Sequence, residues 1–192
     1  GSIYYQAEQE TVQRIEVVYS GDLAEKATKP LTLSVVKGFL CATGNSDVNY
    51  VNAELKLAEF GVELVESRAK QLDKFTNLIT VRFVRKDRTL EVSGTVFGQD
   101  VLRIVDFFGY QMDFEPTPYV LALQNHDVPG IIGKVGTVLG EKGINIAAMQ
   151  WSRKVTGDKA VSFISVDSEV DDATLAQIKA INGILKASRL RF

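Results

Sequence analysis

The sequence has 192 residues, of which 45% are hydrophobic and 24% are charged, and its formal net charge at pH 7 is −2. A chain of this length suits one or two domains, and its charge excludes the basic surface that non-specific nucleic-acid binding needs. The apolar runs are too short to span a membrane, and the single cysteine, Cys41, excludes an internal disulfide framework. We therefore expect a soluble cytoplasmic protein that binds neither nucleic acid nor membranes.

The first part of the chain predicts helices followed by a block of strands. Residues 3–11 are expected to be frayed or helical, and alternation over residues 11–20 predicts a half-exposed strand. Pro30 begins a predicted helix that ends near Gly44. Further strands are predicted at residues 62–67, 78–84, 90–97, 101–108 and 110–114.

A second helix is predicted between these elements, over residues 48–60. Asp47 is its expected N-cap, because a side-chain oxygen there can accept a hydrogen bond from a free backbone N–H. Val51, Leu55 and Ala58 recur at helical spacing and are therefore expected to form its buried face. Helices and strands in blocks predict an α+β domain over residues 1–115.

A second domain is expected over residues 119–192, after the short stiff linker Pro116-Thr117-Pro118. Its six predicted elements are a strand (119–124), a helix (129–142), two strands (144–153 and 159–166), a helix (171–181) and a strand (184–192). The order βαββαβ is that of a ferredoxin-like fold, in which two helices cover one face of a four-stranded sheet.

The first helix of this domain is the most informative segment. Pro129 is expected in its first turn. Residues at helical spacing predict one buried face, and they are Ile131, Ile132, Val135, Val138 and Leu139. Three glycines interrupt the helix, at Gly133, Gly136 and Gly140, and each destabilises a helix by about 0.5–1 kcal/mol. Two interpretations stay open: close packing on the domain's own sheet, or a subunit interface or ligand against the helix.

The chain contains no sequence motif for catalysis. A Gly-rich dinucleotide loop, a phosphate-binding loop and a Cys or His cluster at metal-ligand spacing are all missing. We therefore expect no catalytic residue, no metal and no cofactor in this chain, and a structural role for His126 and Cys41. Because Gly1-Ser2 is typical of a cleaved tag, we also expect a piece of a longer polypeptide.

The loop and helix of the second domain have a distinctive sequence. They contain His126-Asp127-Val128-Pro129-Gly130-Ile131-Ile132-Gly133, then Val135-Gly136 and Leu139, and Gly143-Ile144-Asn145-Ile146 follows. In these residues the second domain resembles the ACT domain, a small regulatory module that binds amino acids in biosynthetic enzymes. This resemblance implies the same ferredoxin-like fold.

The first domain also carries several segments with a distinctive sequence. They are Tyr19-Ser20-Gly21-Asp22-Leu23-Ala24, Leu31-Thr32, Lys37-Gly38, Val48-Asn49-Tyr50-Val51-Asn52-Ala53, Val92-Ser93-Gly94-Thr95-Val96 and Arg103-Ile104-Val105. In these segments it resembles the allosteric substrate-binding domain of long-form D-3-phosphoglycerate dehydrogenases. This resemblance implies a parent enzyme that uses NAD in the first step of serine biosynthesis, with its catalytic domains upstream of this chain.

The resemblance also implies an effector site for L-serine between two paired ACT domains. In the family, the loop of one subunit and an Asn of the other hold the effector. The corresponding residues are Asn125, Asp127, Val128, Pro129, Gly130, Ile131 and Asn145. A helix start suits a carboxylate because free N–H groups and the positive dipole end meet there. Asp127 and Asn145 also fit a purely structural role as turn residues.

A possible anion site in the first domain is implied by the same resemblance. Arg103 occupies one of the basic positions, whereas Glu115 and Ser165 stand where other basic residues are expected. A carboxylate repels an anion, so we expect regulation by substrate or phosphate to be weakened here. The alternative for Arg103 is a solvated strand residue.

Two other functions fit the same sequence. The chain could join subunits without binding a ligand, or it could be the β-chain of an iron–sulfur L-serine dehydratase, which pairs the same two domain types. The dehydratase family begins with a Ser-Ser-His-Thr-like segment that this sequence lacks. Self-association as a dimer or tetramer is expected both for the L-serine sensor and for a chain that only joins subunits.

Overall fold

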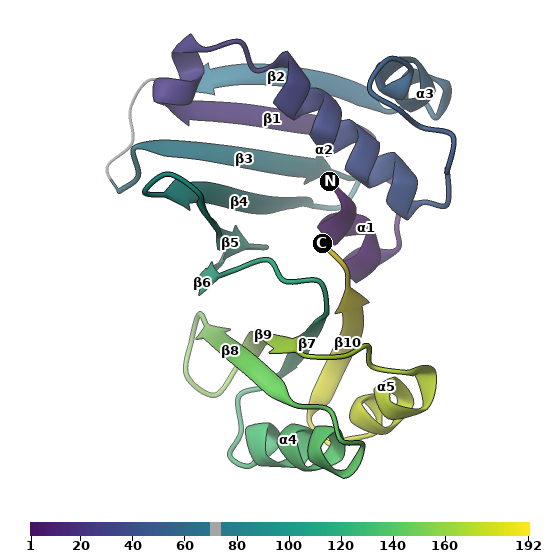
Figure 1. Ribbon diagram of the computed structural model, residues 1–192, viewed down its shortest axis with the longest axis vertical. Coiled ribbons are helices and arrows are strands. Elements are labelled where there is room, and N and C mark those ends of the chain that lie inside the picture. The colour runs from purple at the N-terminus through teal and green to yellow at the C-terminus, as the bar shows by residue number, and fades with distance from the viewer. Residues whose placement is uncertain (70–73) are drawn as a thin grey trace. The chain divides into compact units, whose positions relative to one another are not determined.

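The computed structural model describes residues 1–69 and 74–192 (Figure 1). The chain forms two compact units, Gly1–Gly109 and Tyr110–Phe192. The sequence placed the corresponding domains at 1–115 and 119–192, so the difference between the two divisions is the strand Tyr110–Phe114 and the Pro-containing segment after it. Both units combine helices with a sheet, as expected for an α+β protein.

The first unit is built on a sheet with the strand order β2-β1-β3-β4-β5. Its strands are β1 (Arg14–Gly21), β2 (Glu63–Ala69), β3 (Asn77–Val84), β4 (Thr89–Phe97) and β5 (Val101–Phe107), whereas β6 (Tyr110–Phe114) belongs to the second unit. Strands β1 and β2 run parallel, with Arg14 opposite Glu63, whereas β1 to β5 are otherwise joined by antiparallel pairs. A parallel pair needs a long crossover, and here the crossover contains the helices α2 (Lys29–Ala42) and α3 (Ala53–Glu59).

The helices of this unit are α1 (Ser2–Glu8), the 3-10 helix η1 (Asp22–Glu25), α2 (Lys29–Ala42) and α3 (Ala53–Glu59). Figure 1 shows α2 lying across the sheet. The core contains Tyr4, Phe39 and Phe83, and the rings of Tyr4 and Phe83 are stacked with centroids 4.2 Å apart. Burial of these aromatic rings holds α1 and α2 on the sheet.

Helix α3 differs from its prediction in both its start and its buried face. Its N-cap is Asn52, and Asp47 instead pairs with Lys56 at 2.9 Å. The helix buries Ala53 and Leu57 and leaves the predicted face in solvent, with Val51 95% exposed and Leu55 65% exposed. The prediction was wrong because the segment before Asn52 is a turn, in which the Asn49 side chain accepts hydrogen bonds from the backbone.

The second unit has the predicted order βαββαβ. Its elements are β7 (Val120–His126), α4 (Ile131–Glu141), β8 (Ile146–Arg153), β9 (Lys159–Val166), α5 (Asp172–Lys179) and β10 (Ile184–Leu190). The sheet is antiparallel throughout, with the order β10-β7-β9-β8. Leu121, Leu123 and Ile164 of the sheet pack with Ile131 and Leu139 of α4 in one core. The ferredoxin-like prediction is therefore confirmed.

Helix α4 begins two residues later than predicted. Gly130 is its N-cap, with φ of 90°, and Pro129 lies outside the helix. A left-handed residue at this position favours glycine. Ile131, Val135 and Leu139 are buried as predicted, but Ile132 is 50% exposed.

The three glycines of α4 do not pack closely on the domain's own sheet. A Cβ atom added at Gly133, Gly136 or Gly140 would meet no atom within 4 Å. The interpretation of close packing within the domain is therefore wrong, and the glycine side of the helix is open in the single chain.

Membrane-spanning helices and metal-binding clusters are both missing from the part of the chain that is described. None of the helices within residues 1–69 and 74–192 is long and apolar enough to cross a membrane. In the same ranges, no three His, Cys, Asp or Glu residues come together as a metal site.

Candidate functional site

The loop between β7 and α4 is held in place by backbone hydrogen bonds to neighbouring turns. The His126 N–H donates to the Gly183 carbonyl at 2.8 Å, and the Asp127 N–H donates to the Asp158 carbonyl at 2.9 Å. Gly183 also lies against α4, since a Cβ there would meet Ile131 Cδ1 at 2.7 Å. The position of the loop is therefore fixed by the turns before β9 and β10.

The start of α4 offers free backbone donors. The first N–H groups of a helix have no partner within it, and the Gly130 N-cap supplies no side-chain hydrogen bond. These groups and the positive end of the helix dipole suit a carboxylate or another small anion. The geometry therefore provides half of a site for a zwitterion.

Asp127 provides a negative charge beside this helix start. Its Oδ2 atom accepts hydrogen bonds from the Gly157 N–H at 3.0 Å and from Arg153 at 2.7 Å. The Gly157 amide, and secondarily Arg153, lower the pKa of this carboxyl group below its ordinary value. Both bonds are made to Oδ2, so Oδ1 is not used by either of these two donors. Asp127 thus has a structural role in the single chain. If it is also an effector ligand, it has to serve both roles.

Asn125 lies directly beneath the loop and is completely buried. By strand alternation it shares the face of Leu121 and Leu123, which pack in the core, while His126 is exposed on the other side. The Asn125 amide nitrogen donates to the His126 carbonyl at 2.6 Å. Its Oδ1 atom is buried and, within the described part of the chain, accepts no hydrogen bond.

Asn145 is not brought together with the other predicted site residues. It lies between α4 and β8, where its amide nitrogen donates to Asp167 Oδ2 at 2.8 Å. The loop and Asn145 are at opposite ends of the 11-residue helix α4, which is about 16 Å long at 1.5 Å per residue. One small ligand cannot touch both within one chain.

The structure adds polar groups that the sequence did not reveal. Arg153 and Gly157 reach Asp127 from the β8–β9 hairpin, and Asp167 holds Asn145. Ser162 of β9 is completely buried, and its hydroxyl has no hydrogen-bond partner among the described residues. These polar groups lie near the predicted site residues because of the strand register. The periodicity of the sequence does not reveal that register.

The predicted anion-site residues lie in different settings. Arg103 is on β5 opposite Thr95, and one of its guanidinium nitrogens donates to the Leu102 carbonyl at 3.0 Å. Ser165 is buried in β9, where its oxygen accepts from the Thr117 hydroxyl at 3.0 Å. Glu115 is exposed and lies just beyond β6. The anion site stays a prediction for Arg103.

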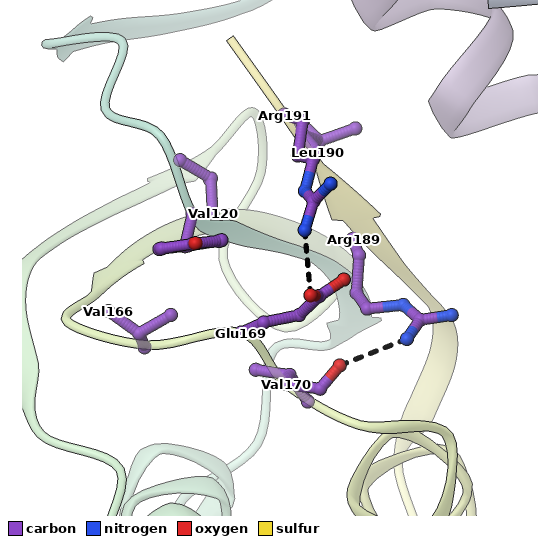
Figure 2. A pocket seen from close by; sticks show the side chains of 8 residues that line it. Val120, Val166, Glu169, Val170, Arg189, Leu190 and Arg191 are labelled. Carbon is purple, nitrogen blue, oxygen red and sulfur yellow. Dashed lines mark hydrogen bonds and ion pairs between the residues drawn. The ribbon is translucent and has the colours of Figure 1, made fainter.

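A shallow pocket lies at the end of the second sheet opposite the β7–α4 loop (Figure 2). Arg191 pairs there with Glu169 at 2.7 Å. Arg189 donates to the Val170 carbonyl at 3.0 Å and pairs with Asp172 at 2.6 Å. Because each guanidinium already faces a carboxylate, this pocket is poorly suited to an anionic ligand.

Comparison with known proteins gives matches along almost the whole chain. Residues 1–108 match the family of the D-3-phosphoglycerate dehydrogenase intervening domain, and residues 119–183 match the ACT domain family. The chain is 32% identical to D-3-phosphoglycerate dehydrogenase of Bacillus subtilis over 96% of its length, and 30% identical to that of Synechocystis over 92%. The Methanocaldococcus jannaschii enzyme is 30% identical over 96% of the chain. These alignments span only 35%, 32% and 35% of the respective relatives.

Proposed function

The chain belongs to the D-3-phosphoglycerate dehydrogenase family, and from its intervening and ACT domains we propose that it senses L-serine for feedback control of such an enzyme. The sensor binds L-serine between the ACT domains of two chains. The parent enzyme is an NAD-dependent oxidoreductase at the first step of serine biosynthesis, and the regulatory part itself performs no chemistry.

One observation carries this proposal more than any other. The open start of α4 and the buried Asn125 lie at one end of the helix, and Asn145 lies at the other end. A twofold axis across the middle of α4 would bring the loop of one chain next to Asn145 of the other, because the two helices then run antiparallel. Each dimer then has two equal sites.

The chemistry of each site suits an amino acid. The effector carboxylate accepts hydrogen bonds from the first N–H groups of α4. The ammonium donates to Asp127 Oδ1, and the Asn145 amide of the second chain completes the site. Inhibition requires that L-serine binds one arrangement of subunits more tightly than the other.

A second candidate function is assembly alone. The glycine side of α4 is open, and Ile132 beside it is 50% exposed. Small residues on a helix permit close approach of another chain whether or not an effector binds. In that case the ACT domains join subunits, and L-serine has no site.

Isothermal titration calorimetry with L-serine separates the two candidates. We expect heat from L-serine at one molecule per chain on a dimer or larger oligomer, and no heat from D-serine, glycine or phosphate. Asn145→Ala should abolish this heat and leave the circular dichroism spectrum unchanged. A well-folded oligomer without a serine signal would support assembly alone.

Asp167→Ala is the matched control for this variant. It removes the same Asn145–Asp167 hydrogen bond from the other side and keeps the amide. L-Serine binding should therefore persist in Asp167→Ala. Equal loss in both variants would assign Asn145 a structural role.

A further inference from the structure

Two buried oxygen atoms beneath the β7–α4 loop have no hydrogen-bond partner in the described structure. They are Oδ1 of Asn125 and the hydroxyl oxygen of Ser162, and both residues are 0% exposed. Buried polar atoms in native proteins are nearly always paired, so each exception calls for an explanation. A bound group with complementary hydrogen-bonding atoms is one such explanation.

The strand register places these two side chains next to each other. Ser162 is directly opposite Leu123 in the β7–β9 pair, and Leu123 is two residues before Asn125 on the same face of the strand. Ser162 and Asn125 are therefore diagonal cross-strand neighbours, a relation with a separation of about 7 Å. One polar atom between them can bond to both side-chain oxygens.

The hydrogen-bonding roles of the two side chains define the chemistry of that atom. One N–H of the Asn125 amide donates to the His126 carbonyl, and the unpartnered atom of this side chain is its oxygen, an acceptor. The Ser162 hydroxyl can donate or accept. A hydroxyl group placed between them donates to Asn125 Oδ1 and accepts from Ser162, whereas a methyl group would leave both unpaired.

We propose that Ser162, together with Asn125, recognises the side-chain hydroxyl of the amino-acid effector. This inference rests on the proposed function and adds the residue that distinguishes L-serine from L-alanine and glycine. Asn125 is the next-to-last residue of β7, directly before the loop that binds the effector backbone. Since both side chains are covered in the free chain, the start of α4 has to shift as the hydroxyl enters.

The decisive variant is Ser162→Ala, which removes one hydroxyl and adds no bulk. Its L-serine affinity, measured by calorimetry on the full chain, should fall about tenfold, the effect of one hydrogen bond. Affinity for L-alanine, measured by competition or at higher ligand concentration, should not change. Ser162→Cys keeps the shape with a weaker donor, and its L-serine affinity should be intermediate.

Ser165→Ala is the matched control. Ser165 is on the same strand and equally deep in the protein, but it faces the other side of the sheet and is paired with Thr117. It should retain the ratio of L-serine to L-alanine affinity. An unchanged ratio in Ser162→Ala, or equal loss of both ligands, would overturn the role of Ser162.

These outcomes are distinct from a failure of the proposed function itself. If the unmodified chain gives no heat with L-serine, the serine sensor is wrong and so is the inference that depends on it. If the unmodified chain binds L-serine and Ser162→Ala keeps the full ratio, only the inference is wrong.

Discussion

Glu66 is the residue whose electrostatic environment gives the clearest expectation for stability. Its carboxylate accepts hydrogen bonds from the Thr28 hydroxyl at 2.6 Å and the Thr32 hydroxyl at 2.5 Å, and both threonines are buried. Tyr19 continues this network through a 2.8 Å hydrogen bond to Thr32. The Thr28 hydroxyl, and next the Thr32 hydroxyl, lower the pKa of Glu66 below its ordinary value.

Glu66→Gln should lower the free energy of unfolding at pH 7 by about 1.5 kcal/mol, the low end for hydrogen bonds to charged groups, since the side chain is 28% exposed. A lowered pKa in the folded state stabilises the fold above the ordinary carboxyl value of 4.5. That contribution disappears as the pH falls through the folded-state pKa. Urea unfolding of both proteins at pH 7 and at acidic pH measures the difference, which should shrink in acid.

Glu63→Gln is the control on the same strand. Its side chain is 64% exposed and lies 3.7 Å from Arg14, so its loss should change stability little, as for other surface pairs. A difference for Glu66→Gln that stayed constant over this pH range would contradict a role for its charge.

At the level of single residues, strand alternation in β7 is enough to place Asn125 and His126 on opposite faces. The partners of Asp127 and Asn145 could not be predicted, because they come from the β8–β9 hairpin and the turn after β9. Side chains that meet through strand register or loop closure leave no periodic signal in the sequence.

Helix α4 offers a test in which stability and assembly should change in opposite directions. Gly136 is in the helix interior, and a Cβ there would meet nothing within 4 Å. Gly136→Ala should therefore raise the free energy of unfolding of the single chain by about 0.5–1 kcal/mol. If another chain packs on this side, the added methyl group should also weaken self-association.

Urea unfolding at low protein concentration measures the first effect, and sedimentation equilibrium measures the second. Ser34→Ala, at an exposed position of α2 in the first unit, provides a control substitution away from α4. Gain of stability without any change in association would show that the glycines do not contact a partner chain.

Among the elements, the βαββαβ order and most strands were predictable because their hydrophobic periods and turn glycines agree. Helix α3 was not. Its apolar residues Val51, Leu55 and Ala58 have helical spacing, but Ala53 and Leu57 have it too, and periodicity does not say which set meets the sheet. The Asn49 turn decides this by fixing where the helix begins.

At the scale of the whole assembly, a shared site predicts complementation between defective chains. Asn145→Ala and Asp127→Ala each damage both sites of their own dimer. In a mixed dimer, the intact loop of the Asn145→Ala chain meets the intact Asn145 of the Asp127→Ala chain. Mixing the two variants after subunit exchange should therefore restore L-serine binding at one site per mixed dimer.

Calorimetry of the mixture, with each variant alone as control, tests this. We expect no binding in either variant alone. Each mixed dimer has half the unmodified number of sites, and since random exchange makes half of the dimers mixed, an equimolar mixture should bind about a quarter of the unmodified amount of L-serine. Absence of recovery after proven exchange would indicate that each site is formed within one chain.

The parallel pairing of β1 with β2 has a consequence for how the first unit folds. Arg14 faces Glu63 in this pair, and about 40 residues of helix and turn lie between the two strands, a loop whose closure is entropically costly. The strands cannot meet until this entire segment has been synthesised, and contacts between residues so distant in sequence slow folding. The other side of β1 waits longer still, because its partner β3 follows β2 in the chain. Both sides of β1 therefore acquire their partners late, and in a growing chain the unpaired backbone of this strand is where a chaperone would have most to protect.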